Sequence, residues 1–127
     1  MLLLSGETAG KGRGHEEGIM DVLIDWESMP WDEPEGEAQK GHRGKACVRE
    51  GQEVWLAEFT EGFVEDGWCR EGHLFHVLEG ESSMRFEDGR LIRLRAGDTG
   101  IILAGKDTHR VEVAAGERIV LIGFEQP

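Results

Sequence analysis

The sequence is poor in positive charge. Its 127 residues include 14 Lys and Arg against 26 Asp and Glu, which gives a formal net charge of -12 at pH 7 with neutral histidines. A chain with this charge is repelled by the phosphates of nucleic acids and by anionic lipid headgroups. We therefore expect neither a nucleic-acid partner nor a membrane partner.

Long apolar runs are also missing. The apolar run at residues 1–4 is too short for an export signal, and no later run is long enough to cross a bilayer. The only cysteines are Cys47 and Cys69, too few for a disulfide framework. We expect a cytoplasmic protein in which both cysteines are thiols and Cys47 packs in the core.

The length of the chain favours a single domain with one hydrophobic core. Residues 1–20 are rich in glycine and charge and show no apolar periodicity, so we expect a disordered tail there. Residues 21–44 are expected to form an irregular arm that packs on the domain through Trp26 and Trp31. Residues 45–127 then form the domain itself.

From residue 45 onward, short β-rich runs alternate with turn residues at regular intervals, which indicates a β-sandwich or barrel. No segment carries a sustained helical period. The expected strands are residues 46–49, 54–59, 74–78, 82–87, 91–94, 99–103, 109–113 and 118–124, with a further short strand at residues 22–26 in the arm. Eight strands suit an antiparallel jelly roll, so the predicted fold class is all-β.

Two short turns are expected to close hairpins. Asp88-Gly89 lies between two apolar runs, and an Asp-Gly pair favours a type I′ turn, in which both central residues have positive φ. Ala115-Gly116 predicts a second hairpin between the last two expected strands.

Three short motifs carry a resemblance to a known family. They are residues 77–81 (VLEGE), residues 96–98 (AGD) and residues 102–105 (ILAG), the last of which leads to His109. On these motifs the chain resembles the cupin superfamily, in particular the small single-domain bacterial cupins labelled phosphoheptose-isomerase-like. The likeness spans about residues 53–124. It implies a cupin-type jelly-roll β-barrel with a polar pocket for a small molecule, and a homodimer.

The resemblance also indicates where a metal would bind. Metal-binding cupins carry two histidines and a glutamate before the strand end, and Gly67, Cys69 and His73 stand in those places here. His109 matches the histidine of the second cupin motif, although Leu103 replaces the proline of the family pattern. The resemblance thus implies a rearranged site with Cys69, His73 and His109 as its ligands.

The chemistry of these side chains is compatible with that ligand set. Residues two apart on an extended strand share a face, so Cys69, Glu71 and His73 would point inward and His76 outward. A thiolate with two neutral imidazoles leaves a fourth position open and suits zinc or copper, with nickel, iron and manganese as alternatives. We expect Glu71 to act as an acid or base, and Glu71 or Glu58 to orient a histidine.

The functional hypotheses stay open, because a buried cysteine is commonly a small hydrophobe and both histidines can simply line an apolar pocket. The first hypothesis is a metal-dependent enzyme acting on a sugar derivative or an organic acid. The second is a non-catalytic module that binds or senses a small ligand without a metal. The third is an assembly protein that uses Leu74 and His76 on its outer face.

Other side chains have a structural and a functional interpretation. Arg85, Arg93 and Arg95 lie on two strands joined by a hairpin, and we expect a solvated face on which they pair with Glu81 or Glu87. The alternative is a forked anion site. Trp55 and Trp68 are expected to pack against the domain, with the pocket mouth as the alternative place for them.

Overall fold

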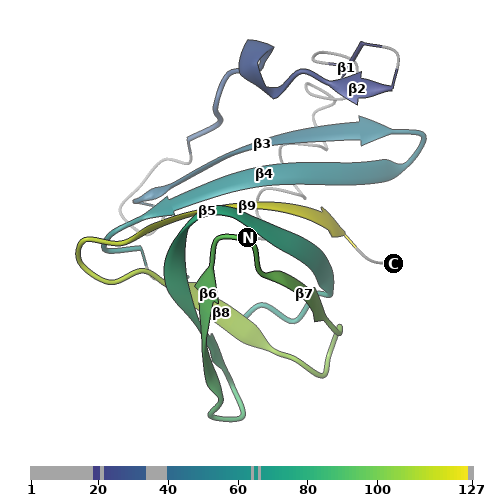
Figure 1. Ribbon diagram of the computed structural model, residues 1–127. Helices are drawn as coiled ribbons and strands as arrows, with labels where there is room; N and C mark the ends of the chain where they lie inside the picture. Colours follow the sequence, from purple (N-terminus) through teal and green to yellow (C-terminus); the bar gives the residue numbers. More distant parts are fainter. Residues whose placement is uncertain (1–18, 21, 34–39, 64, 66, 126–127) are drawn as a thin grey trace.

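The computed structural model describes residues 19–20, 22–33, 40–63, 65 and 67–125, and these form strands almost throughout (Figure 1). The elements are β1 (Ile19–Met20), β2 (Leu23–Ile24), the 3-10 helix η2 (Trp26–Ser28), β3 (His42–Arg49), β4 (Gln52–Thr60), β5 (His73–Phe86), β6 (Leu91–Arg95), β7 (Thr99–Ile102), β8 (His109–Glu112) and β9 (Arg118–Glu125). The all-β prediction is confirmed. Nowhere in this part of the chain is there a helix of the length and apolar character that a membrane crossing needs.

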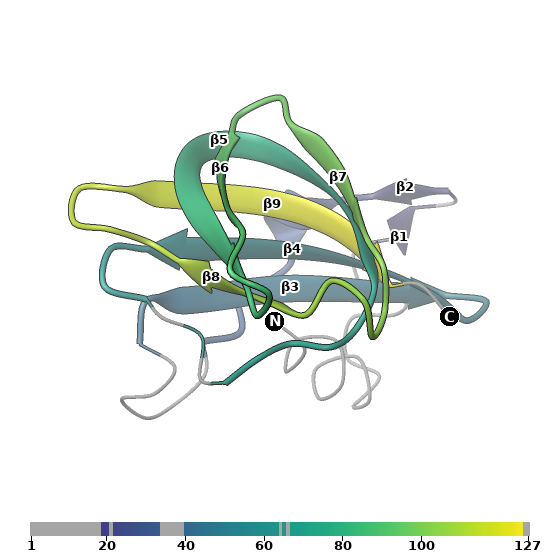
Figure 2. The same cartoon turned by 90° about the horizontal axis from the view of Figure 1, so that it is seen from below.

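Strands β3 to β9 form one antiparallel sheet that curls into a barrel. Its main path runs β3-β4-β9-β5-β6, and β7 and β8 also pair with β5. The first half of β5 lies between β9 and β7, and its second half lies between β6 and β8. In Figures 1 and 2, β3, β4 and β9 make one wall, and β5 bends out of it toward β6, β7 and β8.

The bend in β5 is made at Gly80. The register of β5 against β9 shifts between Val77 and Glu79, as in a β-bulge, and Gly80 has a φ of 78°. A Cβ on Gly80 would lie 1.8 Å from the backbone oxygen of Arg118, so only glycine fits at this point. The two strands expected at residues 74–78 and 82–87 are therefore one 14-residue strand. The prediction of separate strands was wrong because a glycine that bends a strand looks like a turn in sequence.

Inward-facing side chains of both walls fill the barrel. The core consists of Ala46, Trp55, Ala57, Phe59, Phe63, Phe75, Val77, Met84, Phe86, Leu94, Ile102, Val111, Val113, Ile119 and Leu121. Two of its rings lie against glycines of neighbouring strands. A Cβ on Gly123 would lie 2.1 Å from Cζ2 of Trp55, and a Cβ on Gly100 would lie 2.4 Å from Cζ of Phe75. Glycine at these two positions makes room for the two aromatic rings.

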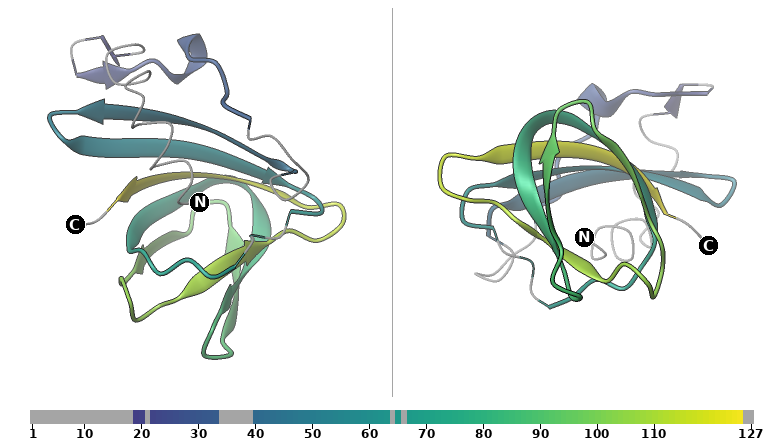
Figure 3. Two further views of the ribbon diagram at one scale, coloured as in Figure 1. Left: turned by 180° about the vertical axis from the view of Figure 1, so that it is seen from behind. Right: turned by 60° about the horizontal axis from the view of Figure 1, so that its bottom comes forward.

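The described part of the arm lies over β3, on the side away from the barrel interior (Figure 3). Nζ of Lys45 donates to the backbone oxygen of Trp26 at 2.6 Å, and Sγ of Cys47 lies 3.5 Å from Sδ of Met29. The guanidinium of Arg43 stands 4.2 Å from the ring centroid of Trp31. The arm therefore covers the outer face of β3.

The boundaries in the arm differ from those expected. Its strand is confined to Leu23–Ile24 and is followed by the 3-10 helix, and β3 already begins at His42. The division into tail, arm and domain stays a prediction, and residues 1–18, where the disordered tail is expected, lie outside the described residues.

The first predicted hairpin is confirmed with a different type of turn, and the second is not formed. At Asp88-Gly89 a tight connection does join β5 to β6, but only Gly89 has a positive φ, so the turn is not type I′. That conformation occurs instead at Glu50-Gly51, between β3 and β4, with φ values of 51° and 80°. At Ala115-Gly116 the chain turns, yet β8 pairs with β5 and β9 pairs with β4 and β5. The turn therefore links opposite walls and closes no hairpin.

Candidate metal centre

The curvature of β5 creates the site. His73 is the first residue of β5 and Phe86 is its last, and Phe86 pairs with His109 at the start of β8. Cys69 forms an isolated antiparallel bridge to His109, with N–O distances of 2.8 and 3.0 Å. Because β5 bends back on itself, residues at its two ends come together at one end of the barrel.

The three expected ligands meet there. Each of Cys69, His73 and His109 is only 1% exposed, and their ligand atoms all lie within 4.8 Å of one another. Sγ of Cys69 is 3.5 Å from Nε2 of His73. For bond lengths of about 2.3 Å to sulfur and about 2.0 Å to nitrogen, a tetrahedral ion separates two such atoms by roughly 3.5 Å. This pair is already at the spacing that zinc requires.

Each histidine is oriented by a hydrogen bond on the far side of its ring. Nδ1 of His109 lies 2.9 Å from the backbone oxygen of Asp107 and donates to it, since a carbonyl can only accept. Nδ1 of His73 lies 3.1 Å from Oε2 of Glu125, which also accepts a hydrogen bond from Nε1 of Trp55. Both Nε2 atoms are thereby left for the centre of the site.

The electrostatics couple the thiol to the imidazoles. Burial alone would raise the pKa of Cys69, but hydrogen bonds with His109 and His73 outweigh burial and lower that pKa to about 7. For His73, burial works toward a lower pKa, and the contacts with Cys69 and Glu125 overcome it and raise the pKa to about 9. The arrangement favours a thiolate, which is the form of cysteine that binds metals.

Glu71 lies beside the three buried residues but not among them. Its side chain is exposed, and interactions with Glu71 contribute to the lowered pKa of both Glu125 and Cys69. The expectation that Glu71 would share an inner face with Cys69 and His73 was wrong, because β5 begins only at His73 and the preceding residues are not a regular strand. His76 is half-buried, and its Nδ1 lies 2.6 Å from Oγ1 of Thr99.

The carboxylate that orients His73 was missed in the sequence. Glu58, one of the two expected candidates, lies on the outer face between Arg43 and Arg118. Glu125 takes the role because it lies on the same face of β9 as Ile119, Leu121 and Gly123, which are spaced two residues apart. The apolar run of β9 is continuous in sequence, so it gives no sign of which face enters the barrel.

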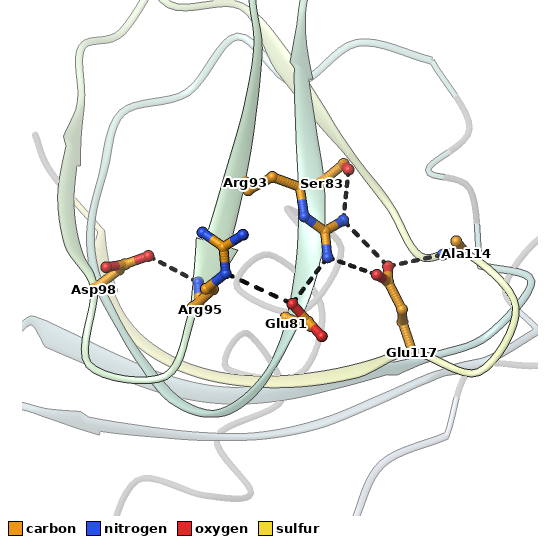
Figure 4. Close-up of polar contacts among 7 residues, drawn as sticks. All are labelled: Glu81, Ser83, Arg93, Arg95, Asp98, Ala114 and Glu117. Atoms are coloured by element: carbon orange, nitrogen blue, oxygen red, sulfur yellow. Dashed lines mark hydrogen bonds and ion pairs between the residues drawn. The ribbon is translucent and has the colours of Figure 1, made fainter.

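The arginines of the hairpin are committed to carboxylates (Figure 4). Arg93 binds Glu81 at 3.1 Å, Glu117 at 2.6 Å and the hydroxyl of Ser83 at 2.9 Å. Arg95 lies 3.8 Å from Glu81. Arg85 pairs with Glu112 and not, as expected for these arginines, with Glu81 or Glu87. These ion pairs favour the solvated charged face over an anion site.

The tryptophans and the second cysteine pack as structural groups. Trp55 is 2% exposed and belongs to the core, and the guanidinium of Arg110 stands 4.6 Å from the ring centroid of Trp68. Cys47 is buried beneath the arm, and it is not joined to Cys69 by a disulfide.

Comparison with solved structures identifies the fold. No protein-family model and no curated protein sequence matches this chain. Its structure is similar to that of the polyketide cyclase RemF from Streptomyces resistomycificus, with a TM-score of 0.72, 13% identity and coverage of 84% of this chain and 79% of that one. It is also similar to a putative ethanolamine utilization protein Q from Salmonella typhimurium, with a TM-score of 0.66, 18% identity and coverage of 90% of each chain.

A third similar structure is a sugar phosphate isomerase from Silicibacter pomeroyi that is described as a member of the cupin superfamily. Its TM-score is 0.63 at 14% identity, with coverage of 81% of this chain and 74% of that one. A cupin-like protein from Thermotoga maritima matches at a TM-score of 0.58 and 20% identity, over 67% of this chain and 68% of that one. At these identities the likeness establishes the fold, and a β-barrel with this topology and these neighbours is a small cupin-fold protein.

Proposed function

We propose that Cys69, His73 and His109 hold a divalent metal ion, zinc or copper in preference to nickel, iron or manganese. The observation that carries the proposal is the 3.5 Å distance between Sγ of Cys69 and Nε2 of His73, in a cluster whose ligand atoms lie within 4.8 Å of one another. One thiolate and two imidazoles suit these softer ions and leave a fourth position open.

The metal would serve a reaction or binding event on a small polar metabolite, such as a sugar derivative or an organic acid. Ions held by three ligands polarise carbonyl oxygens or lower the pKa of bound water. The chain's own residues orient the ligands through Glu125 and Asp107, and Glu71 is the exposed carboxylate from which a proton can be exchanged. Neighbouring cupin structures named as a polyketide cyclase and a sugar phosphate isomerase are consistent with small-molecule chemistry in this fold.

Metal content is the direct test. The full chain would be purified without added metal and without chelators, and its metals would be quantified by plasma mass spectrometry. We expect near-stoichiometric zinc or copper, lost in His109→Ala and kept in His76→Ala, since His76 bonds to Thr99 away from the cluster. A wild-type protein that carries no metal and takes up none of the five ions would refute the proposal.

A second candidate is a non-catalytic module that binds a small ligand without a metal. It is favoured by the hydrogen bond between Cys69 and His73, which already satisfies both groups. In that case a metabolite would raise the melting temperature of the metal-free chain, because a ligand that binds the native state alone stabilises it. No shift with any member of a broad metabolite panel would count against this candidate.

We also propose that the protein is a homodimer that associates through the outer face of β9, β5 and β7. Phe124, Leu74 and Ile101 lie directly opposite one another across these strands, and Phe124 and Ile101 are 42% and 64% exposed. The arm covers the other half of the same sheet, over β3.

A second copy can occupy this face because no acidic side chain lies on it. The side chains on it include no acidic or basic group other than His76: Leu74, His76, Thr99, Ile101, Ile122 and Phe124. Two molecules that each carry a net charge of -12 repel each other wherever charged faces meet. They can approach with the least repulsion through this apolar patch.

A further inference from the structure

A carboxylate that the metal site does not use lies next to it on the inner wall. On β4, Trp55 and Phe59 point into the barrel, so Glu53 points to the same side. The register of β4 and β9 pairs Val54 with Phe124, which places Glu53 beside Glu125. Glu125 in turn pairs with His73 across β9 and β5. Glu53, Glu125 and the metal ligand His73 therefore form one row.

The two carboxylates of this row differ in their hydrogen bonds. Glu125 accepts hydrogen bonds from His73 and Trp55. Burial would raise the pKa of Glu125, but these two partners hold it below its usual range, so it stays ionised. Glu53 has no comparable support, because its Oε2 is shielded from solvent and has no hydrogen-bond partner among the described residues. A shielded acceptor without a donor is unusual in a folded protein.

The surroundings of Glu53 are negative. Burial, followed by the charges of Glu125 and Glu71, raises the pKa of Glu53 to about 7. Of the neighbouring carboxylates, Glu125 is half-buried and Glu71 is exposed, so the carboxylates reach the surface of the protein at Glu71. A ligand that arrives there meets carboxylates before it meets the metal ligands.

Most of the described arginines form ion pairs with carboxylates. The arginines that pair with carboxylates are Arg43, Arg85, Arg90, Arg93, Arg95, Arg110 and Arg118. Arg70 follows Cys69 and Arg110 follows His109, and of these two neighbours of the site Arg110 is paired with Glu112 whereas Arg70 is exposed. It is the group that an anionic ligand would need.

We propose that Glu53 is a ligand-binding residue of the site, and that the site takes a small polar molecule presenting an amine or hydroxyl groups, such as an amino sugar or a polyol, in preference to an organic acid. The inference rests on the proposed metal site and narrows its substrate class. An ammonium or hydroxyl group supplies the donor that Oε2 of Glu53 lacks, whereas a carboxylate or phosphate would add like charge to the row.

A matched ligand series tests this. Glucamine, sorbitol and gluconate share a six-carbon chain and differ at C1, which carries an amine, a hydroxyl or a carboxylate. Each would be titrated into the zinc-loaded full chain by calorimetry, with zinc content measured before and after. We expect glucamine to bind about tenfold or more tightly than gluconate, with sorbitol between them, because a hydrogen bond to a charged group is worth that much.

Two variants separate the role of Glu53 from general effects. Glu53→Gln is expected to weaken glucamine binding about tenfold or more and to keep its zinc, whereas the exposed Glu87→Gln leaves both unchanged. Tighter binding of gluconate, equal binding of all three ligands, no binding of glucamine, or an unaffected Glu53→Gln would each overturn the inference. A wild-type chain that binds none of the five ions would refute the metal site itself, so the two failures are distinguishable.

Discussion

Glu125 holds His73 in place: Oε2 of Glu125 lies 3.1 Å from Nδ1 of His73, and the same oxygen accepts a hydrogen bond from Trp55. The bond keeps the Nδ1 proton on His73 and leaves Nε2 for a metal. We therefore predict that Glu125→Gln weakens zinc binding by about tenfold or more, as for other partners of ligating histidines. Competition with a zinc-binding dye would measure it. Glu112→Gln, which removes a carboxylate paired with Arg85 and Arg110 outside the site, is the control and should leave the affinity unchanged.

Cobalt spectroscopy can show whether sulfur is a ligand. A Cys69 thiolate bound to cobalt(II) gives a near-ultraviolet charge-transfer band that nitrogen and oxygen ligands do not give. We expect this band in the cobalt-loaded wild type and in Cys47→Ser, because Cys47 packs against Met29 beneath the arm. It should disappear in Cys69→Ser. A band that survives in Cys69→Ser would remove Cys69 from the ligand set.

Acid should destabilise the fold through His42. Its ring stacks on Phe59 at a centroid distance of 4.8 Å, neither ring nitrogen has a hydrogen-bond partner among the described residues, and burial lowers the pKa to about 4 from 6.5. The unfolded chain binds a proton below about pH 6.5, whereas the folded chain does so only near pH 4. The contribution of the neutral His42 to the free energy of unfolding is therefore fully present above pH 6.5. It is lost as the pH falls from 6.5 to 4, by up to roughly 3 kcal/mol.

Urea unfolding at a series of pH values would measure that loss. His42→Phe keeps the shape of the ring and has nothing to protonate, so it should flatten the acid side of the profile without loss of stability near neutrality. If the acid slope is the same in His42→Phe, the slope arises from other groups.

The bend of β5 should tolerate no side chain. Gly80→Ala would place a methyl group 1.8 Å from the backbone oxygen of Arg118, at a φ of 78°. We predict a loss of more than about 2 kcal/mol in the free energy of unfolding. Gly89→Ala has a similar φ of 103° but no atom within 4 Å, so it should cost only about 1 kcal/mol. Equal losses in the two variants would show that backbone conformation alone, and not the clash, decides the effect.

The proposed dimer predicts a concentration-dependent mass. Ile101→Lys places a charge in the apolar patch and should convert the dimer to a monomer in sedimentation experiments, whereas Leu91→Lys on β6, also an exposed apolar position, should not. Because each copy carries a net charge of -12, raising the salt concentration should strengthen association of the wild type. A wild type that stays monomeric at high concentration would contradict the proposal.

Much of the barrel was predictable, for a physical reason. Alternation with period 2 reports burial on one face, and the strands around Phe75, Met84 and Val111 follow it closely. What alternation cannot report is which strands pair. The local sequence at Ala115-Gly116 is typical of a hairpin turn. However, β8 pairs with the second half of β5 and β9 pairs with the first half, so the two strands do not pair with each other.

The site was partly predictable on the same grounds. Cys69, His73 and His109 could be named from the motifs, because motif positions follow the fold. Glu125 and Glu53 belong to no motif, and they matter through contacts between β4, β9 and β5 that lie far apart in the chain. Glu71 was assigned to the inner face because side chains two residues apart on a strand share a face. This rule does not apply before His73, where β5 begins.

The continuity of β5 has a consequence for how the barrel opens. Its first four residues pair with both β9 and β7, and its last residues pair with β6 and β8, so this strand takes part in both walls. Its amide protons should therefore exchange with solvent only when the entire barrel unfolds, so that both walls form a single cooperative unit. Cys69, by contrast, reaches the barrel through one isolated bridge. A bound ion would link Cys69 to His73 on β5 and His109 on β8, and would so hold this weakly bonded segment against the barrel. Slower amide exchange around Cys69 when metal is added would show this.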